Sequence, residues 1–234
     1  MRRQREEIRE LLESLVSMAD EAVESLHQAI DAFMSKDPHA QVDINRRDER
    51  IDAMENANDA RCLRIFALYK PEADDLRTVV MALKIINDLE RIGDHAINIA
   101  ERAAELAAVP DTQILPQFQR LGAHARGMVN DAVTAFIARD STLAKAIIHR
   151  DHEVDRLFRE VVSSTIVDDP EHNLPREAVI AMVFCAKELE RVADLATNLA
   201  EDVIFIADGV QVRHELEKKG NKAFGAGPNE VPSG

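Results

Sequence analysis

In the middle of the chain, apolar side chains recur at intervals of three and four residues. At about 100° per residue they fall on one face of a helix. They are Ile85, Leu89, Ile92, Ala96 and Ile99. This spacing predicts a helix whose apolar seam is buried against neighbouring helices.

Prolines divide the rest of the chain into helical pieces, because proline is poorly tolerated inside a helix. They stand at Pro38, Pro71, Pro110, Pro116, Pro170 and Pro175. The pieces predict six helices, over residues 4–36, 39–68, 72–108, 114–139, 141–167 and 175–208. Gly209 marks the expected end of the last helix. Beyond about Glu217 the periodicity is lost, and we expect a disordered tail over residues 217–234.

The chain contains an internal repeat. Residues 88–101 match residues 188–201 at a constant offset of 100, and residues 47–52 match residues 150–155 at an offset of 103. A duplicated unit of three helices explains both matches. The sequence therefore predicts an all-α fold of two tandem, pseudo-symmetric three-helix bundles, over residues 1–108 and 112–209.

Each copy carries two pairs of acidic residues spaced four positions apart. The pairs are Asp48 with Asp52, Glu90 with Asp94, Asp151 with Asp155, and Glu190 with Asp194. Like charges one helical turn apart cost about 0.2–0.5 kcal/mol. A divalent cation would turn this repulsion into attraction, and carboxylate oxygens suit magnesium, manganese or iron. A solvated polar face is the ordinary explanation for a single such pair, so spacing alone leaves both interpretations open.

The acidic pairs are embedded in recognisable motifs. Glu-Arg-(Ile/Val)-(Gly/Ala)-Asp occurs at residues 90–94 and 190–194, followed by Asn98 and Asn198, and Pro-Glu-Ala-Asp-Asp-Leu-Arg occupies residues 71–77. Together these motifs resemble the PhoU family of bacterial phosphate-transport accessory proteins. The resemblance implies a six-helix protein that carries surface metal clusters in some members.

By position, the resemblance implies a ligand set in each copy. The implied ligands are Asp48, Asp52, Glu90 and Asp94 in the first copy and Asp151, Asp155, Glu190 and Asp194 in the second. Residues that continue the acidic stripes are second-rank candidates, namely Asn98, Glu101, Asn198 and Glu201. The expected ions are iron, manganese, magnesium or zinc.

The resemblance also implies a function without catalysis. We expect a cytoplasmic adaptor, present as a homodimer, that negatively regulates phosphate uptake and the phosphate-starvation response. Its implied partners are the ATPase of the phosphate ABC transporter and the phosphate-sensing histidine kinase. Metal binding would partly neutralise the acidic surface of the adaptor.

Composition and charge narrow the class of partner. Aromatic residues make up 4% of the chain and Trp is absent, which argues against β-sandwiches and base-stacking platforms. The net charge of −14 disfavours nucleic acid or anionic lipid as the main partner. The longest apolar run, residues 178–186, is far shorter than the roughly twenty residues of a membrane span. Cys62 and Cys185 provide no disulfide framework, so we expect a reducing compartment.

Two alternatives from other functional classes stay open. One is a carboxylate-bridged, di-iron-type metalloenzyme, and the other is a purely structural helical scaffold. Glu24 and His27 form a Glu-x-x-His motif, but a di-iron bundle uses that motif on two inward-facing helices. No other histidine has a glutamate three positions before it, which disfavours the oxidase.

Overall fold

The computed structural model describes residues 2–109, 112–166 and 174–212, and within these ranges it contains helices joined by short turns and no strand. The helices are α1 (Arg2–Ser35), α2 (Ala40–Tyr69), α3 (Ala73–Ala107), α4 (Pro116–Ala138), α5 (Ser141–Ile166) and α6 (Arg176–Asp208). These bounds confirm the six predicted helices to within two residues at each end. The tail predicted over residues 217–234 lies outside the described residues.

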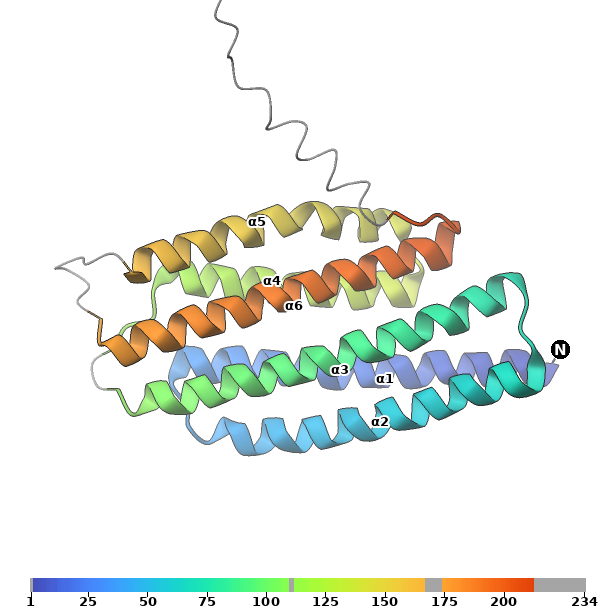
Figure 1. Cartoon of the computed structure of the whole chain (residues 1–234), viewed down its shortest axis with the longest axis horizontal. Helices are drawn as coiled ribbons and strands as arrows, with labels where there is room; N and C mark the ends of the chain where they lie inside the picture. Colours follow the sequence, from blue (N-terminus) through green and yellow to red (C-terminus); the bar gives the residue numbers. More distant parts are fainter. Residues whose placement is uncertain (1, 110–111, 167–173, 213–234) are drawn as a thin grey trace, which may run out of the picture.

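The helices form two antiparallel bundles, one from α1 to α3 and one from α4 to α6 (Figure 1). The bundles meet along two contacts, where α3 packs against α6 and α1 packs against α4. Figure 1 shows α3 and α6 running side by side in opposite directions through the centre of the molecule. The predicted pair of three-helix bundles is therefore confirmed.

The connection between the first two helices has the same backbone conformation in both bundles, between α1 and α2 and between α4 and α5. Lys36 and Arg139 adopt left-handed backbone conformations, with φ of 55° and 50°. The backbone N–H of the next residue, Asp37 or Asp140, donates to the carbonyl five residues earlier at 2.9 Å. Each aspartate side chain then accepts a backbone N–H near the start of the following helix, again at 2.9 Å. The two copies of the sequence repeat therefore share the same backbone conformation and hydrogen bonds at this connection.

The predicted apolar seam of α3 is buried. All five of its residues are at most 1% exposed: Ile85, Leu89, Ile92, Ala96 and Ile99. Burying an apolar side chain of this size stabilises a fold by about 1.5–3 kcal/mol. Between the bundles, the rings of Phe33 on α1 and Phe118 on α4 lie with their centroids 4.6 Å apart. The core therefore continues from one bundle into the other.

None of the described helices contains an apolar stretch long enough to cross a bilayer. The cysteines Cys62 and Cys185 are buried and unbonded. Burial raises the pKa of both thiols, that of Cys62 to about 12. Both side chains therefore serve as small apolar core residues.

Candidate metal centre

Gly93 allows α2 and α3 to approach closely. A Cβ atom at this position would lie 3.0 Å from Ile51 Cδ1 and 3.3 Å from Asp48 Oδ1. Both neighbours belong to α2, so the missing side chain leaves room for that helix. The acidic flank of α2 consequently lies beside the acidic stripe of α3.

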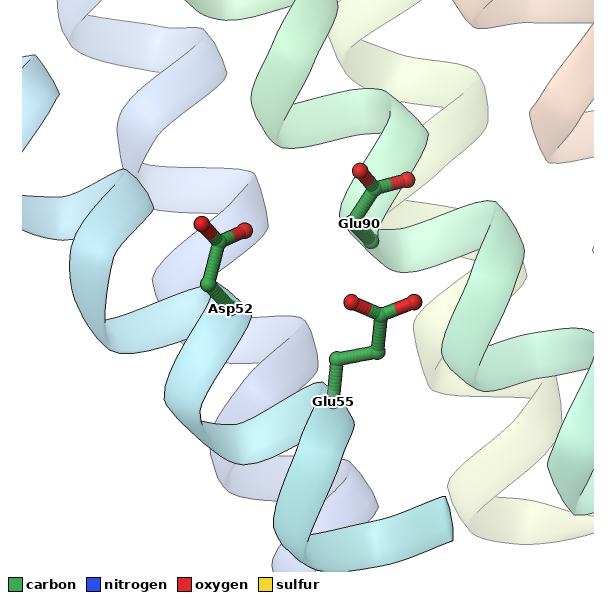
Figure 2. Close-up of side chains that lie close together, drawn as sticks. All are labelled: Asp52, Glu55 and Glu90. Atoms are coloured by element: carbon green, nitrogen blue, oxygen red, sulfur yellow. The ribbon is translucent and has the colours of Figure 1, made fainter.

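Three carboxylates from these two helices converge. Oxygens of Asp52, Glu55 and Glu90 all lie within 4.8 Å of one another. Figure 2 shows Asp52 and Glu55 on α2 and Glu90 on α3, with the three side chains close together. Asp52 is exposed, whereas Glu55 and Glu90 are half-buried. The site therefore opens to solvent on one side.

The surrounding charges are of one sign. Burial, together with the charges of the neighbouring Asp94 and Glu55, raises the pKa of Glu90 to about 7. Burial likewise raises the pKa of Asp48 to about 6, with Asp52 adding to the effect. Glu55 also has a raised pKa, from burial and nearby aspartates. We call these five residues the first acidic cluster: Asp48, Asp52, Glu55, Glu90 and Asp94.

Within the described part of the chain, no lysine, arginine or histidine forms an ion pair with the first acidic cluster. The arginines next to Asp48 and Glu90 in the sequence are engaged elsewhere, since Arg47 pairs with Glu21 and Arg91 with Asp88. Oxygen donors without a protein counter-charge fit a hard or borderline divalent cation. Asp52, Glu55 and Glu90 would hold such an ion directly.

The corresponding residues of the second bundle also lie together. We call Asp151, Asp155, Glu190 and Asp194 the second acidic cluster. Burial raises the pKa of Asp194 to about 6, and the charges of Glu190 and Asp151 contribute. Unlike the first acidic cluster, this one contains a cation, because Lys187 forms an ion pair with Glu190. Among the described residues, only the first bundle brings three potential ligands within mutual reach.

Comparison with known proteins assigns the chain to a family. The model of the PhoU domain matches twice, over residues 15–103 and 118–203. The chain belongs to the PhoU family. The two PhoU domains correspond to the two bundles, and each match contains one acidic cluster.

Individual PhoU proteins resemble the whole chain. A phosphate-specific transport system accessory protein PhoU homolog from Aquifex aeolicus is 36% identical over 218 residues, covering 92% of this chain and 97% of the relative. PhoU of Escherichia coli K12 is 30% identical over 216 residues, covering 91% and 90%. The crystal structure of Pseudomonas aeruginosa PhoU has a TM-score of 0.80 at 30% identity, covering 88% of this chain and 99% of that one. The fold predicted from the PhoU resemblance is therefore confirmed.

Of the four predicted ligands in the first PhoU domain, the structure places Asp52 and Glu90 in the converging group, which also contains Glu55 but not Asp48 or Asp94. The internal repeat gives no signal for Glu55, because Phe158 occupies the matching position in the second copy. The available signal for Glu55 was its position three residues after Asp52, since that spacing puts the two carboxylates on one helix face. Among the second-rank candidates, Asn98 donates instead to Glu188 on α6, at 2.9 Å.

Within the described residues, the hydrogen bonds of the Glu-x-x-His motif involve no residue of either acidic cluster. His27 Nε2 lies 3.3 Å from Asn130 Nδ2 on α4, and Glu24 accepts a hydrogen bond from Gln28 at 2.9 Å. Burial lowers the pKa of His27, and the charge of Arg126 acts in the same direction. Neither residue belongs to the converging ligand group found among the described residues. The acidic clusters are built from carboxylates.

Proposed function

We propose that this chain is a metal-dependent regulator of phosphate uptake. The observation that carries the proposal is the convergence of Asp52, Glu55 and Glu90 from two helices without a basic partner among the described residues. The family relationship supports phosphate transport as the process that is regulated. Relatives are named phosphate-specific transport system accessory proteins, and the PhoU of known structure from Streptococcus pneumoniae is named a phosphate transport system regulatory protein.

A bound cation would fix the spacing of α2 and α3. Without it, the carboxylates of the two helices repel one another or take up protons, as the raised pKa of Glu90 indicates. A divalent ion would replace that repulsion with attraction to both helices. Iron, manganese, magnesium and zinc all bind carboxylate oxygens, so the donor atoms do not distinguish among these metals, and metal analysis of the purified protein would identify the ion.

The regulator would act by contact and without catalysis. Its partners would be the ATPase of the phosphate ABC transporter and the phosphate-sensing histidine kinase, in the cytoplasm. A net charge of −14 favours docking on basic protein surfaces, because complementary charge speeds and orients association. Metal occupancy would set how much negative charge the first bundle presents. We further propose a homodimer, which light scattering on the purified protein would test.

Complementation of a deletion strain tests the proposal. The strain would receive the wild-type chain, the double variant Glu55→Gln with Glu90→Gln, or the control Asp20→Asn on exposed α1 surface. In phosphate-rich medium, we expect the wild type and control to repress a phosphate-uptake reporter. The double variant should lose bound metal and repression while keeping its helical circular dichroism spectrum.

Two outcomes would contradict separate parts of the proposal. Unchanged reporter expression in the deletion strain would remove the regulatory role. Full repression by a double variant shown to be metal-free would remove the role of the metal. Pull-down of the transporter ATPase with and without chelator measures partner binding directly, and we expect the chelator to weaken this binding.

A further inference from the structure

The two acidic clusters differ at two aligned positions. Glu55 of the first bundle corresponds to Phe158 in the second at the offset of 103, and Asn87 corresponds to Lys187 at the offset of 100. The second copy therefore has an aromatic ring in place of a carboxylate, and an ammonium group in place of a neutral amide. Both changes work against cation binding.

Lys187 reaches directly into the second acidic cluster. Its Nζ donates a hydrogen bond to Glu190 Oε2. The same nitrogen lies 5.6 Å from the centroid of the Phe158 ring, within the range of a cation–π contact. The Glu190 side chain is 17% exposed and that of Lys187 is 43% exposed, so the pair is partly shielded from water. The ammonium group of Lys187 thus contacts both the Phe158 ring and the Glu190 carboxylate.

The first acidic cluster lacks this arrangement. Asn87, the counterpart of Lys187, is exposed and carries no charge. Among the described residues, none of the five carboxylates of that cluster has a basic ion-pair partner. The same backbone framework thus presents five acidic groups in one bundle, and four acidic groups with a bound ammonium in the other.

We propose that Lys187 takes the place of a metal ion in the second acidic cluster, so that the chain holds its divalent cation in the first bundle. The inference rests on the proposed function, because it assumes that the first acidic cluster binds a cation. A divalent ion approaching Glu190 would have to displace the ammonium group, and it would meet charge repulsion from Lys187. Loss of the Glu55 equivalent removes one oxygen donor as well. The ligands expected at Asp151, Asp155, Glu190 and Asp194 would then serve an internal ion pair.

Titration of the full chain with Mn²⁺ tests the inference. Isothermal calorimetry and metal analysis after gel filtration would be applied to the wild type, Glu90→Ala and Glu190→Ala. A further double variant, Lys187→Asn with Phe158→Glu, gives the second bundle the residues of the first. Lys145→Asn is the charge-matched control, because Lys145 pairs with Asp208 on the surface, at 3.1 Å.

We expect Glu90→Ala to abolish wild-type Mn²⁺ binding and Glu190→Ala to leave it unchanged. The double variant should gain a second class of site, at least about tenfold tighter than any residual binding there, which Glu190→Ala then removes. Lys145→Asn should gain none. Equal losses in Glu90→Ala and Glu190→Ala would overturn the inference, as would a folded double variant with no added site.

The reciprocal change separates the inference from the proposed function. Asn87→Lys with Glu55→Phe should remove the Mn²⁺ site of the first bundle while the helical signal is retained. A wild-type chain that binds no Mn²⁺ would contradict the proposed function. If the double variant in the second bundle then binds Mn²⁺, the claim that Lys187 and Phe158 together block this cluster stands independently of the first bundle, and if it binds none, both claims fail.

Discussion

His95 on α3 and Glu188 on α6 join the two bundles, with His95 Nδ1 2.7 Å from Glu188 Oε2. Both residues are buried, at 8% and 7% exposure. Asn98 donates to the same carboxylate oxygen, and Arg191 donates to the other at 3.0 Å. Burial acts to raise the pKa of Glu188, but the hydrogen bonds from Asn98 and His95 lower it below its ordinary value. The carboxylate is thus held ionised at the junction of the bundles.

Removing this carboxylate should destabilise the protein. Glu188→Ala leaves the buried ring nitrogen of His95 without its partner, which costs about 1–3 kcal/mol, and it also removes the acceptor of Asn98. Urea denaturation at neutral pH would measure the loss. Asp43→Ala is the control, because Asp43 forms an exposed ion pair with Arg46 and such pairs contribute about 0–1 kcal/mol. Equal effects of the two substitutions would contradict the role of the buried pair.

Packing between α1 and α4 should depend on the aromatic contact. Phe118→Ala removes a fully buried ring beside Phe33, and a truncation of this kind costs about 3–5 kcal/mol. Thermal unfolding followed by circular dichroism would show a lower midpoint. Ile137→Ala, at a 57% exposed position on the same helix, should change the midpoint little. A loss no larger for Phe118→Ala than for Ile137→Ala would argue against the continuous core.

The metal-free protein should lose stability as the pH rises toward neutrality. The pKa of Glu90 is about 7 in the folded protein and near 4.5 in the unfolded chain, so the folded state binds more protons between these values. The free energy of unfolding therefore falls as pH increases across this window and levels off above it. Urea denaturation in chelator, at about pH 5 and about pH 7.5, would measure the slope.

Glu90→Gln supplies the control for this pH dependence. The amide does not titrate, so the variant should lose less stability than the wild type between the two pH values. An unchanged slope would contradict the assignment of the raised pKa to Glu90. Adding Mn²⁺ at the higher pH should restore wild-type stability, because a ligand of the folded state alone stabilises that state.

Close approach of α2 to α3 should require a small residue at position 93. Gly93→Val places methyl groups where Ile51 and Asp48 already lie, and overpacking of this kind costs about 1–3 kcal/mol. We expect weaker Mn²⁺ binding as well, because Asp48 would be displaced. Gly93→Ala is the matched control, since the flexible end of Ile51 can yield and alanine favours the helix by about 1 kcal/mol. Unaltered Mn²⁺ affinity in Gly93→Val would refute the link between this approach and the site.

Much of the fold follows from local signals in the sequence. Proline positions predict where the helices end, and the apolar seam through Leu89 and Ile92 predicts a buried helix face. Both features depend only on residues that are close together in the sequence. The repeat predicts the pairing of bundles. The contact between His95 and Glu188 had no such signal, since it joins residues far apart in sequence and Leu195 replaces the histidine in the other copy.

The candidate site was predictable only in part for the same reason. Symmetry between the copies pointed to Asp52 and Glu90, which have acidic counterparts, and it hid Glu55, which has none. Symmetry also suggested that both clusters are equivalent. Lys187 breaks that equivalence. Its spacing of three residues from Glu190 permits an ion pair on one helix face, but its contact with Phe158 on α5 had no local signal.

Anomalous diffraction from crystals soaked in MnCl₂ tests the central claim most directly. Data collected at the manganese absorption edge would locate any bound ion without reference to function. We predict a peak within coordination distance of Asp52, Glu55 and Glu90, and its loss in crystals of Glu90→Ala. A wild-type crystal with open solvent access to these carboxylates and no anomalous peak beside them would contradict the account.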